Sequence, residues 1–325
     1  MRGRRELLAA GAVLAMPAAA RAEAAGSWPE RPVSVVNPFA AGGFTDGFGR
    51  TVFQQMQRLL GQPFVVDYRP GAGATLGAAH VARSAADGYT LLYSPTTAWV
   101  LAPYLYRNPG YDPLVDLTPV GIIAETPMVL CSRQGLSFPS TAALVAAAKA
   151  EPGRFSIANA GTGSLPHIMA TLLAAVAGIE INNVPYRGGG PAMNDLVAGH
   201  VDLFWEAIPN VTQHVESGRV HALMISGEAR SPALPAVPTV TEAGFPALNL
   251  TSWIALGAPA GLPAPILATL NRAMNEALAA PEVRETMQRL SLVPVGGAPA
   301  VMAEQMRREG AVYKRIITEA RISSE

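Results

Sequence analysis

An apolar run, a glycine-rich turn and a helix-forming segment follow one another three times in this sequence. The first case is the run Val33–Asn37, the turn 38–46 and the segment 47–60. The other two have their turns at 159–167 and 187–191. Strands that alternate with helices in this way are typical of βαβ units and a mostly parallel sheet. The sequence therefore predicts an α/β fold.

The first turn is a candidate anion site that contains no lysine or arginine. Paired glycines let the backbone approach a bound group, and a helix start offers unpaired N–H groups with partial positive charge. Thr45 and Asp46 are good N-cap types. An ordinary capped turn, with glycines for steric reasons, is an equally open alternative. The candidate ligand-binding residues here are Phe39, Gly42, Gly43, Phe44, Thr45 and Asp46.

The other two glycine-rich turns are candidate anion sites for the same reason, because each leads into a predicted helix. Ser164 fits an N-cap and Pro166 an early helix position. For His167, a structural hydrogen bond competes with ligand contact. The candidates from these turns are Gly161, Thr162, Gly163, Ser164, His167, Tyr186, Gly188 and Gly189.

Further candidates lie at or near strand ends. Ser94, Thr96 and Thr97 stand at the end of the third predicted strand, 89–94, and either line a cleft or form an ordinary polar loop. Asp202 and Trp205 belong to an apolar strand, 199–205. For Asp202 the alternative is a buried, paired structural role, and for Trp205 it is a place in the core.

Composition excludes several classes of protein. The 325 residues, half of them apolar, suffice for two domains. Of 24 basic and 24 acidic residues, four and one lie in 1–22, which leaves 20 and 23, so no basic surface for nucleic acid is expected. One cysteine excludes an internal disulfide, and no metal motif is present. Gly71–Gly77 resembles a dinucleotide fingerprint, but Leu76 stands where the third glycine belongs, so no cofactor is expected.

The N-terminus has the three-part form of a secretory signal. A basic start is followed by the apolar run Leu7–Ala20 and by Ala20-Arg21-Ala22, a small-x-small cleavage site. The run is too short to span a bilayer. We expect cleavage near Ala22 and export to a bacterial periplasm; Arg4-Arg5 leaves the twin-arginine route open beside the general one.

Two long apolar runs, Val120–Ser132 and Ser252–Ala258, suit an antiparallel pair of crossovers between two lobes. We expect residues 27–125 and 252–325 to form lobe 1, and residues 126–251 to form lobe 2. The segments 265–279 and 299–320 carry the helical period and are expected to be amphipathic helices.

These motifs, in this order, resemble one known family. The chain is similar to the solute receptors of tripartite tricarboxylate transporters, also called Bug receptors. The motifs that carry the resemblance cover essentially all of the chain after residue 22: Pro38–Asp46, Tyr68–Gly73, Ala86–Leu91, Tyr111–Pro113, Leu117–Val120, Gly161–Ser164, His167, Val184–Ala192, Asp195-Leu196, Gly199–Asp202, Arg230–Pro235, Val237–Thr239 and Glu242–Gly244.

The resemblance implies a two-lobed periplasmic binding protein of type II-like form, each lobe a central sheet flanked by helices, joined by a two-strand hinge. It implies a small organic carboxylate in the cleft, held by backbone N–H groups and hydroxyls of both lobes. Membrane transporter subunits are the implied partners, and we expect a monomer. Phe44 and Trp205 depart from the family pattern, and with Trp99 they favour a ligand with an aromatic or apolar body.

Two other functions compete with a transport receptor. A sensor subunit would present ligand to a membrane signalling kinase, and sequence does not separate sensing from transport. A secreted hydrolase is disfavoured because no G-x-S-x-G elbow is present and because Ser164 and His167 stand together at one helix start. We expect no enzymatic activity.

Overall fold

The structure is a computed structural model that describes residues 28–42, 44–136, 138–319 and 322. The predicted signal segment 1–22 lies outside the described residues, as do Gly43 and the side chain of Phe44. None of the helices in the described part is long and apolar enough to cross a membrane.

The first of two sheets has six strands in the order β11-β4-β10-β3-β1-β2. It is mixed, because β1 pairs in parallel with β2 and β3 whereas β10 pairs antiparallel with β3 and β4. The strands are β1 (Val33–Asn37), β2 (Phe64–Tyr68), β3 (Thr90–Pro95), β4 (Leu117–Thr126), β10 (Ser252–Pro259) and β11 (Val293–Gly296).

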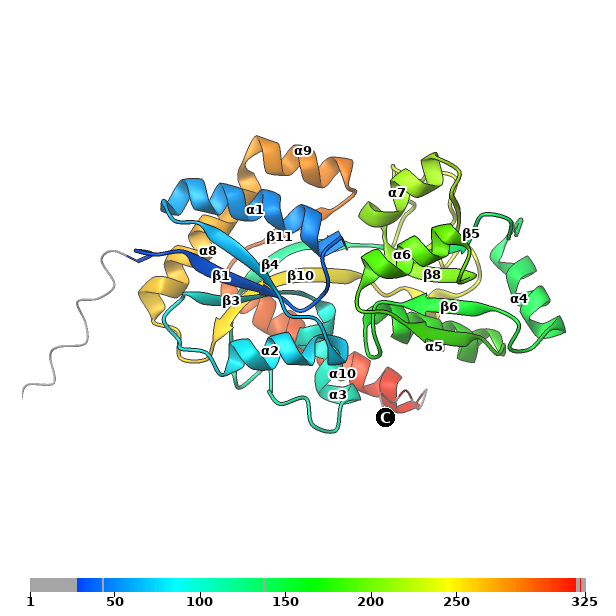
Figure 1. Cartoon of the computed structure of the whole chain (residues 1–325), viewed down its shortest axis with the longest axis horizontal. Coiled ribbons are helices and arrows are strands. Elements are labelled where there is room, and N and C mark those ends of the chain that lie inside the picture. Colours follow the sequence, from blue (N-terminus) through cyan, green and yellow to red (C-terminus); the bar gives the residue numbers. More distant parts are fainter. Residues whose placement is uncertain (1–27, 43, 137, 320–321, 323–325) are drawn as a thin grey trace, which may run out of the picture.

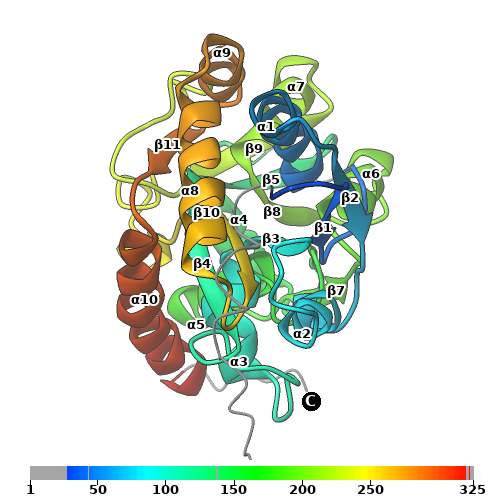
Figure 2. The same ribbon diagram turned by 90° about the vertical axis from the view of Figure 1, so that its left-hand side faces the viewer.

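Helices cover both faces of the first sheet (Figure 1). One face carries α1 (Phe44–Leu60), α8 (Ala264–Ala279) and α9 (Pro281–Arg289). The other carries α2 (Thr75–Ala82), a π-helical turn (Thr97–Leu101), α3 (Ala102–Leu105) and α10 (Pro299–Glu319). Figure 2 shows α8 in front of β4 and β10, with α10 beside them.

The second sheet has five strands in the order β7-β6-β8-β5-β9. Its strands are β5 (Met128–Arg133), β6 (Ser156–Asn159), β7 (Asn182–Pro185), β8 (Leu203–Ala207) and β9 (Val220–Ile225). The helices around it are α4 (Thr141–Ala150), α5 (Leu165–Ala177), α6 (Gly189–Ala198) and α7 (Ile208–Glu216). The predicted α/β fold class, two sheets each flanked by helices, is therefore confirmed.

The strand expected over 120–132 is in fact two strands. β4 belongs to the first sheet and β5 to the second, and Pro127 separates them. Proline has no backbone N–H, so a ladder of hydrogen bonds does not continue through it. β10 pairs antiparallel with β4 as expected, from Ser252 opposite Thr126 to Pro259 opposite Leu117. The lobe boundaries drawn from sequence stay a prediction.

One local expectation needs correction. Helix α1 begins at Phe44, so Thr45 and Asp46 lie in its first turn and are not its N-cap. In α7, Pro209 lies in the first turn, where proline is already shaped for a helix.

The two lobes touch along their glycine turns. The Ala40 N–H donates to the Arg187 carbonyl at 3.2 Å, and the Tyr106 hydroxyl donates to the Thr162 carbonyl at 2.6 Å. A β-carbon added at Gly190 of α6 would lie 3.0 Å from the Gly42 carbonyl carbon. The turns after β1 and before α6 therefore meet at backbone distance, which encloses the space between the lobes.

Candidate functional site

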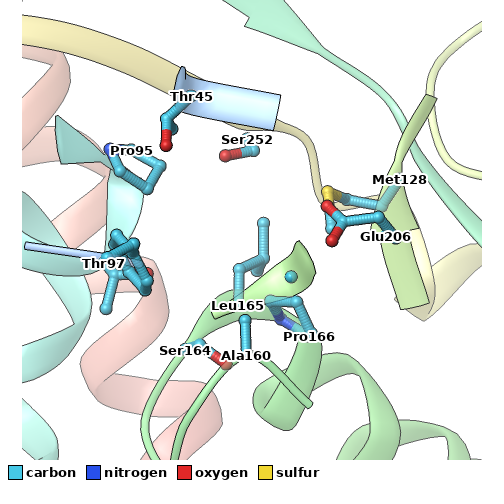
Figure 3. Close-up of a pocket in the computed structure, with 12 residues that line it drawn as sticks. Thr45, Pro95, Thr97, Met128, Ala160, Ser164, Leu165, Pro166, Glu206 and Ser252 are labelled. Atoms are coloured by element: carbon cyan, nitrogen blue, oxygen red, sulfur yellow. The ribbon is translucent and has the colours of Figure 1, made fainter. Parts of the chain in front are cut away.

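A cavity of about 460 Å³, partly open to solvent, lies between the two sheets (Figure 3). We call it the interlobe cavity. Strand ends and helix starts of both sheets line it with apolar groups, four hydroxyls and one carboxyl group. Its lining residues are Phe39, Thr45, Pro95, Thr97, Met128, Ala160, Ser164, Leu165, Pro166, Gly189, Glu206 and Ser252.

Asn37 shapes the turn between β1 and α1. Its buried amide accepts from the Phe39 N–H at 3.1 Å and donates to the Thr45 hydroxyl at 3.3 Å. A polar side chain at the end of a buried strand therefore connects the turn to the helix that follows. Both residues that it holds, Phe39 and Thr45, line the cavity.

Asp46 does not line the interlobe cavity. It accepts hydrogen bonds from the Gly42 N–H at 3.0 Å, from the Arg50 guanidinium at 2.9 Å and from the Tyr68 hydroxyl. Burial alone would raise the pKa of Asp46, but these donors hold it below the usual value. The carboxylate therefore stabilises the turn that contains Gly42.

Of the three polar candidates at the end of β3, only Thr97 lines the cavity. The fully buried Ser94 hydroxyl donates to the Pro95 carbonyl at 3.1 Å. The Thr96 hydroxyl accepts from the Trp253 N–H at 2.8 Å. The hydroxyl groups of Ser94 and Thr96 are therefore hydrogen-bonded within the protein, that of Thr96 to the backbone of β10.

The turn before α5 brings Ser164 to the cavity. Ser164 is the N-cap residue, yet its side chain does not cap the helix, and its buried Oγ has no hydrogen-bond partner. His167 Nδ1 accepts from the Gly163 N–H at 3.1 Å, so His167 serves the turn. Burial lowers the pKa of His167, which keeps the imidazole neutral.

A second hollow adjoins the interlobe cavity and shares Phe39 and Ala160 with it. Gly161, Thr162 and Tyr186 line this hollow, as does Arg187, but they do not line the interlobe cavity. The hollow encloses about 1190 Å³ of atom-free space, much of it open to solvent.

The turn before α6 contributes Gly189 to the cavity. Gly188 has a φ of +148°, and a β-carbon there would lie 3.3 Å from the Ala40 backbone nitrogen. Glycine is therefore required where this turn crosses the other lobe. Tyr186 donates from its hydroxyl to Asp195 at 2.7 Å.

Asp202 precedes the first residue of β8, whereas the cavity lies at the other end of that strand. It accepts from the Ser156 N–H at 2.9 Å and from the Arg133 guanidinium at 2.9 Å. Burial alone would raise the pKa of Asp202, but these donors hold it below the usual value. These contacts agree with the alternative given from sequence, a buried and paired structural role for Asp202.

Trp205 and Trp99 are core residues, fully buried and absent from the cavity lining. Successive side chains of a strand point to opposite faces, so Trp205 turns away from the side to which Glu206 points. The Trp99 indole donates to the Ser94 carbonyl at 2.9 Å. Neither tryptophan supports an aromatic ligand.

Glu206 is an acidic residue of this cavity that was not among the candidates from sequence, although Trp205-Glu206 departs from the family pattern. It is 4% exposed at the end of β8. Its Oε1 accepts from the Ala207 N–H at 2.7 Å, whereas Oε2 has no hydrogen-bond partner. Burial raises the pKa of Glu206 to about 7. A charged residue inside an otherwise apolar strand was the available signal.

The cavity offers neutral donors rather than cations. The first turns of α1, α5 and α6 contribute Thr45, Leu165 and Gly189 to its lining. No lysine or arginine of the described residues lines it. Helix starts carry partial positive charge and attract anions. Within the described part of the chain, no group of three or more His, Cys, Asp or Glu side chains is placed to hold a metal ion.

A comparison with models of known protein families identifies the family of this chain. Residues 48–321 match the model described as "Tripartite tricarboxylate transporter family receptor". The chain belongs to this receptor family. The resemblance seen in the turn motifs is thus confirmed, and the family is one of solute receptors rather than enzymes.

The receptor has curated and structural relatives over most of its length. BugT of Bordetella pertussis is 38% identical over 95% of this chain and 97% of its own. The periplasmic binding protein BugD has a TM-score of 0.88 at 34% identity, over 91% of this chain and 99% of its own.

Two further solved structures are titled with ligands. An R. palustris protein with adipate has a TM-score of 0.87 at 33% identity, over 91% of this chain and 99% of its own. MatC of Rhodopseudomonas palustris, with bound malate, has a TM-score of 0.86 at 34% identity, over 89% of this chain and 100% of its own.

Proposed function

We propose that this receptor captures a small organic anion with at least one carboxylate in the interlobe cavity, for a tripartite tricarboxylate-type transporter. One observation carries the proposal: starts of helices from both lobes meet at one cavity that contains the unpartnered hydroxyl of Ser164. Backbone N–H groups and hydroxyls are suited to a carboxylate. Neutral donors also suit a receptor, because the bound anion has to be released.

The relatives support the same ligand class. Adipate and malate, named in the titles of two similar structures, are both dicarboxylates. In this chain the wall between the polar groups is apolar and includes Phe39, Met128 and Leu165. We therefore propose a ligand with an apolar or aromatic body, on the evidence of Phe39 and not of the two tryptophans.

We also propose the location, the oligomeric state and the partners of this receptor. It is exported after cleavage near Ala22, acts in the periplasm as a monomer and meets membrane transporter subunits there. Residues 27–125 with 252–325, and residues 126–251, are the two lobes that close over the ligand. The separation of the β4 and β5 sheets at Pro127 supports this division.

A thermal-shift screen of the purified protein tests the ligand class. The panel contains aliphatic dicarboxylates, aromatic monocarboxylates and the amide of each acid. A true ligand raises the melting temperature, since binding to the folded state at 100 times Kd stabilises it by about 2.7 kcal/mol. We expect acids to stabilise and their amides to fail. Equal stabilisation by acid and amide, or none by any acid, contradicts the proposal.

Recovery of the ligand tests the receptor role. We expect chromatography to return the bound acid chemically unchanged after prolonged incubation with the protein. Turnover of an ester or amide from the same panel, absent in a Ser164→Ala variant, would instead indicate a hydrolase.

A further inference from the structure

Glu206 is the one acidic residue that lines the interlobe cavity among the described residues, and no lysine, arginine or histidine of that part of the chain lines it. Its Oε1 accepts from the Ala207 N–H at 2.7 Å, but Oε2 is buried without a partner. Asn210 on α7 lies close enough to favour the charged carboxylate, yet its Nδ2 forms no hydrogen bond. Within the described residues, Glu206 therefore has one oxygen free for a ligand and no cation beside it in the cavity wall.

Two other acidic residues, Asp46 and Asp202, are held as carboxylates in a different way. They form ion pairs with Arg50 and Arg133, with N–O distances of 2.9 Å in both pairs. Donors and cations favour a charged carboxylate, whereas burial favours the neutral acid. Burial prevails at Glu206 and raises its pKa to about 7, and the Ala207 N–H and Asn210 oppose this only in part. Glu206 therefore exchanges its proton near neutral pH.

The other titratable side chains on the elements packed around β8 are neutral, paired or exposed. They are Cys131 and Arg133 on β5, His167 on α5, Asp195 on α6, and His214 and Glu216 on α7. Burial raises the pKa of Cys131 and lowers those of His167 and His214, so these three are neutral where Glu206 titrates. Arg133 is paired with Asp202, and Glu216 is exposed. Asp195 accepts from the Tyr186 hydroxyl at 2.7 Å.

The side of the cavity that belongs to the first sheet adds no further charge. None of the described lining residues from that side has a titratable side chain. A change of charge in the cavity near neutral pH therefore belongs to Glu206.

The charge of Glu206 matters because the cavity is proposed to take an anion. An ionised Glu206 would repel a bound carboxylate, but with a proton on Oε2 the same residue becomes an O–H donor. Ser164, whose buried Oγ has no partner, can donate as well, and Figure 3 shows the two residues on different elements around the cavity. Gly189 leaves the room that Oε2 needs, because a β-carbon added there would overlap with it. A neutral Glu206 thus gives the cavity a second donor.

We infer that Glu206 takes up one proton from solvent on Oε2 when a carboxylate enters the interlobe cavity, donates it in a hydrogen bond to that carboxylate, and returns it to solvent when the ligand leaves. The inference rests on the proposed function and adds a proton to its binding equilibrium. The proton does not come from the ligand, since an unperturbed carboxylic acid has lost its own proton above about pH 5. Binding should therefore weaken as pH rises through the pKa of Glu206.

Titration calorimetry on the purified protein counts this proton. Adipate, malate and 3-phenylpropanoate serve as probes, each in buffers of different ionisation enthalpy at the same pH. Glu206 of the free protein titrates near pH 7, so we expect uptake of close to one proton per bound acid at about pH 8.5 and roughly a tenth of a proton at about pH 6. Over the same range Kd should rise about 30-fold, since each pH unit above the pKa costs about a factor of ten.

Variants assign the proton to Glu206. Glu206→Gln cannot titrate, and its amide N–H replaces the O–H donor. We expect it to take up no proton, to bind with a Kd that changes less than about threefold with pH, and to bind more tightly than wild type at high pH. Glu216→Gln, on the exposed end of α7, is the matched control and should keep the wild-type proton uptake. Gly189→Ala should displace Oε2 and flatten the pH profile.

The outcomes separate this inference from the proposed function. Binding without proton uptake at high pH, uptake that Glu206→Gln retains, or no binding by any of the three probes overturns the inference. If carboxylates of the wider panel still bind, the proposed function stands. If Glu206→Gln does not fold, the proton count of wild type and the profile of Gly189→Ala decide the matter.

Discussion

The polar residues in and near the cavity form two groups: those whose polar atoms are hydrogen-bonded within the protein, and those whose polar atoms are not. Asp46 and His167 accept hydrogen bonds within their own turns. The hydroxyl of Ser164 and one oxygen of Glu206 are buried and have none. Since buried polar atoms are nearly always hydrogen-bonded, unpartnered atoms of residues that line the cavity are the better guide to a ligand.

Ser164→Ala should weaken ligand binding without weakening the fold. Loss of a hydrogen bond to a charged group costs about 1.5–3 kcal/mol, so Kd should rise about 10- to 100-fold. The melting temperature of the free protein should change little, because Oγ has no partner within the protein. Calorimetry and thermal denaturation measure the two effects.

Ser140→Ala is the matched control for this prediction. The Ser140 hydroxyl accepts from the Ala143 N–H at 3.2 Å and caps α4. Its loss should cost about 1 kcal/mol of stability and leave Kd unchanged. The reverse pattern in the two variants would assign Ser164 a structural role.

Glu206 should make the free protein less stable as pH rises. Burial raises its pKa to about 7 from the 4.5 expected in an unfolded chain, so the folded state retains a proton that the unfolded state has lost. The stabilising contribution is complete below pH 4.5 and is lost as pH rises through 7. Burial, and after it the charge of Glu206, raises the pKa of the Cys131 thiol.

Unfolding of wild type and Glu206→Gln between pH 5 and 8 measures this effect. The free energy of unfolding of wild type should fall relative to the variant by roughly 1–3 kcal/mol, since each unit of pKa difference is worth about 1.4 kcal/mol. Parallel profiles for the two proteins would show that the pKa of Glu206 does not differ between the folded and unfolded states.

At the scale of elements, glycine turns let the lobes meet backbone to backbone. The turn before α6 meets the turn after β1 at Ala40 and Gly42. Such approaches leave no room for a β-carbon. The same turns that present helix starts to the cavity thus also form the contact between the lobes.

Gly190→Ala should hinder this contact. The new methyl carbon would lie 3.0 Å from the Gly42 carbonyl carbon, which is backbone and not a flexible side-chain end. We expect ligand affinity to fall at least tenfold, with little loss of stability in the free protein because alanine suits a helix better than glycine.

Gly47→Ala is the control on another helix. An added β-carbon there meets nothing within 4 Å, and Gly47 lies in α1. It should raise stability slightly and leave affinity unchanged. Unchanged affinity in Gly190→Ala as well would show that the bound state does not need this contact.

For the whole molecule, the arrangement suits hinge closure. The chain passes from the first sheet to the second at Pro127, and it returns between β9 and β10. A short connection such as Pro127, between β4 and β5, is typical of hinges around ligands. The hydrogen bonds from Ala40 and Tyr106 across the lobes then belong to the closed form.

Small-angle scattering should show compaction when the best ligand of the thermal-shift screen is added. We expect a smaller radius of gyration in saturating ligand and little change in Gly190→Ala. An identical scattering curve with and without a tightly bound ligand would contradict closure.

Much of the architecture followed from local sequence. The apolar runs at β1, β3 and β10, and the amphipathic segments at α8 and α10, were predicted within one or two residues. The family motifs predicted two sheets flanked by helices. These features depend on the order of residues along the chain, through apolar periodicity and turn chemistry, and need no knowledge of distant contacts.

Tertiary structure alone decided which side chains face the cavity. Trp205 and Glu206 are neighbours in sequence, yet one packs in the core and the other lines the cavity, because strand alternation sends them to opposite faces of β8. Trp99 and Asp202 were satisfied by partners that no local pattern identified. The sequence by itself determined the strands, turns and helix starts, whereas the packing of two lobes determined which polar atoms were left without a partner.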